Sequence, residues 1–149
     1  MLTENASARA EADIRALLEN WRQAFLKRDL DTIMDSYTPD VVAFDAILKL
    51  QFKGVEAYRK HWQACLDMCP GDLEFEIAEL GVEASDDIAF GHYLSRCGGS
   101  NDKGEMSASW MRATIALRRV GERWKIAHEH FSAPFDPVSH KAMFDLVPE

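Results

Sequence analysis

The hydrophobic pattern of this chain changes its period once, at Pro70-Gly71. Before that point most apolar side chains recur every three or four residues, as in amphipathic helices, apart from two short strand-like stretches within 41–53. After it they alternate with polar side chains, as in half-buried strands. Helices followed by a run of strands are typical of an α+β domain, in which helices cover one face of an antiparallel sheet. At 149 residues, the chain has the length of one such domain.

The expected elements can be placed from their boundary residues. Asp29 can cap a second helix, Pro39 disfavours a helical residue before it, and Pro70-Gly71 ends the third helix. We expect helices over 7–28, 29–38 and 55–69, and strands over 41–47, 48–53, 73–80, 88–97, 107–120 and 123–131. A flexible loop is expected at 98–104 and a hairpin turn at Gly121. Residues 1–149 should form a single domain, with a core over about 10–137 and a short tail over 138–149.

The alternation slips by one residue at Glu79. Leu73, Phe75 and Ile77 share one phase. Leu80 takes the other phase, so a β-bulge is predicted between them. Because a bulge bends a sheet, we expect a curved, cone-shaped antiparallel sheet that is roofed by the three helices. A cone of this kind offers a pocket for a small molecule.

The charge of the chain excludes two classes of partner. Its 25 Asp and Glu outnumber its 17 Lys and Arg, so the phosphates of nucleic acids and of anionic membranes would be repelled. Eight of the carboxylates lie within 61–95, a stretch without Lys or Arg, which favours a solvated strand face over a cation site. No apolar run approaches the ~20 residues that span a bilayer. With a polar N-terminus and three cysteines, which cannot all pair, we expect a cytoplasmic protein.

The final hairpin carries a recognisable set of residues, namely Trp124, His128, His130, Ser132 and Pro134. This pattern resembles the end of SnoaL-like and ketosteroid-isomerase-like proteins, and also of the association domain of calcium/calmodulin-dependent kinase II. Upstream, LKRDLDTIMDSYTPDVVAFD and FKGVEAYRKHW are similar to the helix-helix-strand opening of the same nuclear transport factor 2-like superfamily. The resemblance covers about 10–137 and implies a cystatin-like fold, whereas activity has to be argued from the site.

The resemblance also implies a pocket. Asp45 falls where ketosteroid isomerases keep their general base, and Tyr58 and His92 match pocket positions of the kinase association domain. Strand alternation adds further side chains to the pocket face. The expected pocket residues are Trp21, Asp45, Tyr58, His92, Arg112, Thr114, Glu129 and Phe131. Trp21 and Thr114 stand where the family keeps its oxyanion-hole acids; neither matches an acid as a proton donor, which argues against steroid isomerisation.

The sequence is compatible with two functions. The first is an isomerase, cyclase or dehydratase acting on a small, partly apolar organic molecule, with Asp45 as base and Tyr58, His92 or Arg112 as electrophilic partner. The second is a non-catalytic module for ligand binding or dimerisation. Arg112 could either pair with Glu129 or receive the carboxylate of an acidic ligand.

Metal and cofactor sites are not expected. His128 and His130 share a strand face, but that face should form a subunit interface. His61, Cys65 and Cys69 align on a helix whose neighbouring residues favour core packing. No glycine-rich phosphate loop is present in the sequence. We expect a homodimer formed through the sheet face that bears His128 and His130, with Trp124 and Ile126 on the same face.

Overall fold

The computed structural model describes residues 3–149 and contains three helices and six strands in the expected order. The helices are α1 (Glu4–Leu26), α2 (Leu30–Asp35) and α3 (Val55–Met68). The strands are β1 (Tyr37–Phe44), β2 (Phe52–Lys53), β3 (Leu73–Ala84), β4 (Ile88–Ser100), β5 (Met106–Val120) and β6 (Arg123–Ser132). The α+β class predicted from the change of period is therefore confirmed.

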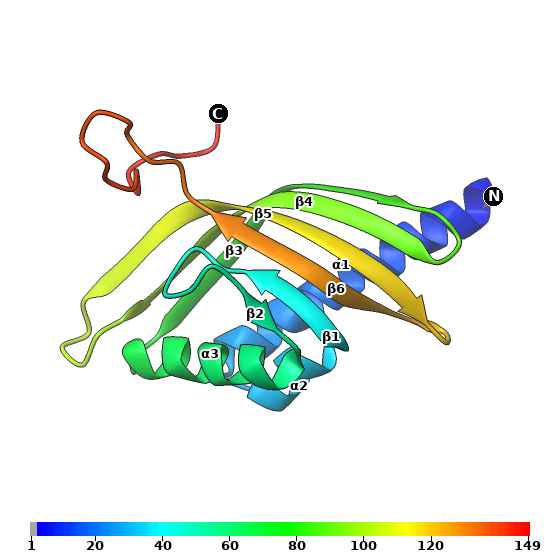
Figure 1. The fold of residues 1–149 in the computed structure, drawn as a ribbon, viewed down its shortest axis with the longest axis horizontal. Coiled ribbons are helices and arrows are strands. Elements are labelled where there is room, and N and C mark those ends of the chain that lie inside the picture. Colours follow the sequence, from blue (N-terminus) through cyan, green and yellow to red (C-terminus); the bar gives the residue numbers. More distant parts are fainter. Residues whose placement is uncertain (1–2) are drawn as a thin grey trace.

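The six strands form one curved sheet in the order β2-β1-β6-β5-β4-β3. All neighbouring pairs are antiparallel except β1 and β6, which run parallel. Figure 1 shows the helices on the concave side of the sheet, and the C-terminal segment beyond the end of β6 on the other side. The register of β3 against β4 shifts between Ala78 and Gly81, and Glu79 has a φ of 56°. The β-bulge predicted at Glu79 is therefore confirmed.

The second helix is shorter than predicted. Asp29 caps it as expected, because its carboxylate accepts a hydrogen bond from the Thr32 backbone N–H. The helix ends at Asp35, however, and Tyr37 begins β1 with its ring buried. Pro39 consequently lies inside a strand. The register of β1 against β6 is irregular between Tyr37 and Val42, as expected around a proline, which has no N–H to donate.

The strand predicted over 48–53 is largely absent. Only Phe52 and Lys53 form β2, and the chain between Ala46 and Leu50 bends without regular structure. Leu48 has a φ of 73°, a left-handed backbone conformation that interrupts a strand. As a result, Asp45 lies directly after β1, at the start of an irregular connection.

A second bulge changes the expected faces of β6. Its register against β5 shifts between Ala116 and Leu117, opposite Ala127. Trp124 and Ile126 therefore point into the core together with Glu129 and Phe131, and all four are buried. The prediction that Trp124 and Ile126 lie on the outer face with the histidines is wrong, because simple alternation fails across the bulge.

The core lies between the helices and the concave face of the sheet. Its centre is a group of aromatic rings, with centroids 4.8–5.9 Å apart, from α1, α3 and β3. These rings belong to Trp21, Phe25, Trp62 and Phe75. Within residues 3–149, no helix combines the length and apolar character that crossing a membrane requires.

The segment predicted as a flexible loop at 98–104 begins as regular structure, because β4 continues through Ser100. Gly98 and Gly99 serve close packing there. A Cβ on Gly99 would meet the Cys69 side chain at the end of α3, and one on Gly98 would overlap the Ser107 carbonyl oxygen and the Ala108 backbone on β5.

We expect Gly98→Ala to lower the free energy of unfolding by about 1–3 kcal/mol, because the added methyl group forces β4 and β5 apart. Urea denaturation measures this change. Adding Ala108→Gly should not restore stability, since the Ser107 carbonyl oxygen is still in the way. An unchanged free energy of unfolding in Gly98→Ala would contradict the close approach of the two strands.

Candidate functional site

A cavity of about 190 Å³ lies between α3 and the concave face of the sheet. Its wall is mainly apolar and is formed by Phe25, Trp62, Leu66, Met68, Leu73, Phe75, Met111 and Phe131. The sulfur atoms of three free cysteines, Cys65, Cys69 and Cys97, add to this lining. Such a wall suits a compact apolar molecule.

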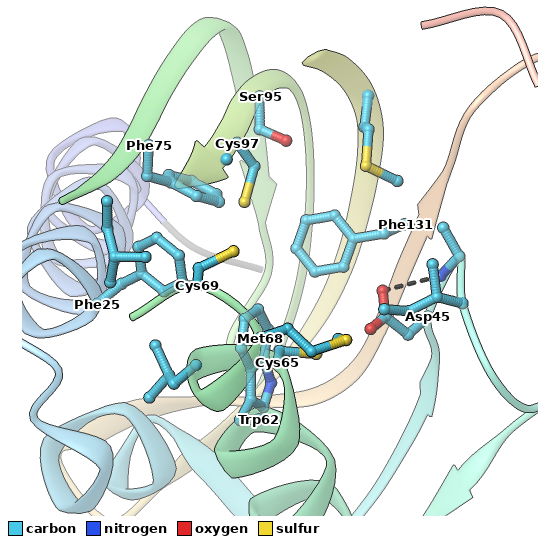
Figure 2. Close-up of a pocket in the computed structure, with 16 residues that line it drawn as sticks. Phe25, Asp45, Trp62, Cys65, Met68, Cys69, Phe75, Ser95, Cys97 and Phe131 are labelled. Carbon is cyan, nitrogen blue, oxygen red and sulfur yellow. Dashed lines mark hydrogen bonds between the residues drawn. The ribbon is translucent and has the colours of Figure 1, made fainter. Parts of the chain in front are cut away.

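Asp45 is the one charged side chain among the described residues that line the cavity. Figure 2 shows its carboxylate at one side of the cavity, next to Phe131. One oxygen, Oδ1, accepts a hydrogen bond of 2.8 Å from the Ala46 backbone N–H, and Oδ2 contacts Nε2 of His61. The Asp45 side chain is only 11% exposed. The carboxylate is thus held in a fixed orientation at the border between solvent and an apolar cavity.

His61 holds this carboxylate from α3. Its side chain is buried, and its ring stacks on Phe52 with centroids 4.0 Å apart. The same Nε2 atom lies 3.6 Å from the Sγ atom of Cys65, one helical turn further on. Burial, and secondarily the charge of Asp45, raises the pKa of the Cys65 thiol to about 12. Without a bound cation, Cys65 is therefore protonated at neutral pH and is a poor nucleophile.

Ser95 is the second notable polar group in the cavity wall. It lies on β4 and is fully buried, and its hydroxyl has no hydrogen-bond partner among the described residues. A buried hydroxyl without a partner is energetically costly unless a ligand or water satisfies it. The Ser95 hydroxyl can therefore bind a polar atom of a ligand that fills the cavity.

A second polar cluster is buried deeper, around Glu129 of β6. Oε2 of Glu129 accepts hydrogen bonds from the hydroxyl groups of Tyr37, at 2.8 Å, and Tyr58, at 2.5 Å. The indole N–H of Trp21 donates to the Tyr37 hydroxyl at 2.9 Å. Burial raises the pKa of Glu129 to about 7, although the two tyrosine hydrogen bonds lower it. Burial also raises the pKa of both tyrosines, so they remain donors.

The predicted pocket residues fall into three groups. Asp45 and Phe131 line the cavity. Trp21, Tyr58 and Glu129 are brought together in the buried cluster. The remaining three, His92, Arg112 and Thr114, are exposed side chains of β4 and β5.

The prediction that His92, Arg112 and Thr114 face the pocket is wrong. Their neighbours on the same strands, Tyr93 and Ala113, point into the core, so these three side chains lie on the opposite face. Arg112 also does not pair with Glu129. Its guanidinium donates to the Ser132 hydroxyl at 3.2 Å.

Four contributors were not predicted. Ser95 falls within the strand predicted over 88–97, and nothing in the sequence marks it as a pocket residue. His61 and Cys65 stood out in the sequence through their helical spacing, but nothing linked them to Asp45. Tyr37 falls within the helix predicted over 29–38, so its hydrogen bond to Glu129 could not be foreseen.

Comparison with known proteins agrees with this architecture. A family model described as a SnoaL-like domain matches residues 14–136. A nuclear transport factor 2-like protein of unknown function from Pseudomonas putida KT2440 is 49% identical, with 95% of this chain and 99% of that chain covered and a TM-score of 0.87. No curated protein matches the chain.

Two more distant structures share the fold. A ketosteroid isomerase-like protein from Erwinia carotovora atroseptica is 22% identical over 81% of this chain and 93% of its own, with a TM-score of 0.69. A candidate dehydratase of the nuclear transport factor 2-like family from Streptomyces avermitilis is 14% identical. The match covers 85% of this chain and 97% of that chain, with a TM-score of 0.75.

Proposed function

This chain belongs to the SnoaL-like family of nuclear transport factor 2-like proteins, and we propose that its cavity binds a compact, mainly apolar carbonyl compound. In this proposal Asp45 acts as a general base that removes a proton from the carbon beside the carbonyl group. The reaction class is isomerisation, cyclisation or dehydration, each of which can begin with this proton transfer.

One observation carries the proposal: a single carboxylate borders an otherwise apolar cavity and is held by a buried histidine. An apolar wall excludes water and orients the reacting carbon, and the hydrogen bond to His61 fixes the base.

The electrophilic partner differs from the one expected from sequence. Because His92 and Arg112 face outward, they are replaced in the proposal by the Ser95 hydroxyl, which is buried without a partner in the cavity wall. It would donate a hydrogen bond to the ligand oxygen as negative charge develops there. Tyr58 is committed to Glu129 and supports the fold around the cavity.

Deuterium exchange tests this function without knowledge of the natural product. A panel of small cyclic and aromatic ketones would be incubated in D₂O with the protein and EDTA, and loss of the α-C–H signals followed by NMR. We expect accelerated exchange for at least one ketone that also raises the melting temperature. Ketones that bind but do not exchange would favour the second candidate function.

That second candidate is ligand binding without turnover. It is favoured by the two positions at which the resemblance places the oxyanion-hole acids. Trp21 occupies one, with its N–H donated to Tyr37, and Thr114 faces away from the core at the other. Turnover therefore depends on the Ser95 hydroxyl as the hydrogen-bond donor that stabilises the negative charge on the ligand oxygen.

Homodimerisation stays a prediction, with a revised surface. Phe44, which is 36% exposed, packs edge-on against His128 and His130, with ring centroids 4.7 and 5.5 Å away. Together these rings form an outer patch that a second copy would cover. We expect sedimentation at micromolar concentration to show a dimer, and Phe44→Glu to shift it toward a species of ~17 kDa because two charges would then face each other. A wild-type chain that sediments only as a monomer would exclude the dimer.

A further inference from the structure

We propose that Asp45, His61 and Cys65 form a binding site for a divalent transition-metal ion such as Zn²⁺. The three side chains offer one carboxylate oxygen, one imidazole nitrogen and one sulfur, and these atoms all lie within 4.8 Å of one another. They come from the end of β1 and from two successive turns of α3. Carboxylate, imidazole and thiolate are the ligand types that zinc and cobalt share.

The spacing of the donor atoms fits such an ion. Zinc lies about 2.0–2.1 Å from a histidine nitrogen and about 2.3 Å from a cysteine sulfur, so a tetrahedral site separates the two donors by about 3.6 Å. The observed distance between His61 Nε2 and Cys65 Sγ is 3.6 Å. The Asp45 carboxylate would have to withdraw from Nε2 to complete the site. In the metal-bound form the contact of Asp45 Oδ2 with Nε2 would thus be replaced by a bond from each of these two atoms to the ion.

The shared histidine nitrogen argues for a cation and against a catalytic relay. In a Cys-His-Asp relay the two partners use different ring nitrogens of the histidine. Here Nε2 of His61 faces both Asp45 and Cys65. A neutral imidazole nitrogen can serve only one of them as donor or acceptor. A metal ion placed among the three atoms binds all of them at once.

Rigidity and charge also favour the site. His61 and Cys65 are four residues apart on one face of α3, and the His61 ring is fixed by stacking on Phe52. The carboxylate and a thiolate together neutralise a divalent ion, which suits its position beside an apolar wall. Asp45 and Cys65 both line the cavity, so a fourth ligand of the bound ion would come from the cavity side. Three protein ligands and one open position are typical of zinc sites that act on a substrate or water.

The site shares Asp45 with the proposed function but does not depend on it. A carboxylate oxygen bound to a metal ion cannot accept a proton, so the metal-free chain is the form in which Asp45 acts as the base. The exchange assay contains EDTA for this reason. Failure of exchange and failure of metal binding are therefore separate results.

Titration of the untagged, metal-free chain with Co²⁺ tests the site. We expect one equivalent to bind and to produce a near-ultraviolet charge-transfer band from thiolate to cobalt. Cys65→Ser should abolish the band and weaken binding at least about tenfold, as for the loss of metal-site partners in general. Asp45→Asn should keep the band and bind more weakly, because the sulfur ligand remains.

Cys97→Ser is the matched control, since Cys97 also lines the cavity but lies outside the three-residue cluster. Both the band and the affinity should stay as in the original chain. The proposal is overturned if no thiolate band forms, if the band survives Cys65→Ser, or if Asp45→Asn leaves the affinity unchanged.

Discussion

Replacement of Asp45 by Asn is expected to reduce deuterium exchange of a responsive ketone by at least about 100-fold. Asn has nearly the same shape as Asp and can still hydrogen-bond to the Ala46 N–H and to His61, so the cavity should keep its form. It cannot take up a proton from carbon. NMR measurement of the exchange rate at the α-carbon, in D₂O that contains EDTA, gives this reduction directly.

Asp40→Asn provides the matched control for this variant. Asp40 lies on β1, the strand that ends just before Asp45, but its side chain is 70% exposed and pairs with Arg118 on the surface. This variant should exchange at the original rate. The role given to Asp45 is wrong if Asp45→Asn retains full exchange while it binds the ketone with unchanged affinity.

The chain is expected to lose about 2.5 kcal/mol of stability between pH 5 and pH 8 because of Glu129. Burial raises the pKa of this carboxyl group to about 7, against an ordinary value of 4.5. Between these values the folded state binds more protons than the unfolded state. The free energy of unfolding therefore falls as the pH rises, until Glu129 is ionised in both states.

Glu129→Gln should remove most of this pH dependence. The amide stays neutral at every pH, and its oxygen can still accept hydrogen bonds from Tyr37 and Tyr58. Urea denaturation at pH 5 and pH 8 would give the free energies of unfolding. Three other carboxyl groups, those of Asp29, Asp35 and Asp40, have a lowered pKa, so they affect stability only at more acidic pH.

Glu122→Gln is the control for Glu129→Gln, because Glu122 is exposed in the turn between β5 and β6. In Glu122→Gln, the free energy of unfolding should differ between pH 5 and pH 8 by the same amount as in the original chain. If the free energy of unfolding of Glu129→Gln changes between pH 5 and pH 8 as much as that of the original chain, the buried carboxyl group does not titrate in this range.

The fold could be predicted wherever a boundary residue or a clear periodicity was present. Asp29 marked the start of α2 and Gly121 the turn between β5 and β6, and the slip at Glu79 marked the bulge. Prediction failed on the faces of β4 and β5. Both faces of β4 carry apolar residues, for example Phe90 outside and Tyr93 inside, so alternation alone did not determine which one is buried.

The candidate site could be predicted only in part, because its residues come from elements that are far apart in the sequence. The resemblance predicts Asp45 as a pocket residue, and Asp45 lines the cavity, but its contact partner His61 lies on another element, 16 residues away. Glu129 and Tyr37 are separated by 92 residues and meet only because β1 and β6 are neighbours. Contacts of this kind follow from the topology of the sheet, and a local sequence pattern does not predict them.

The position of β6 also has a consequence for how the chain folds. It is the last strand in sequence, yet it lies in the interior of the sheet, between β1 and β5. During synthesis, β1 and β2 on one side and β3 to β5 on the other have no shared edge until residues 123–132 leave the ribosome. The sheet can therefore be completed only when residues 123–132 are free to pair, and it depends on a contact between the first and last strands of the kind that slows folding.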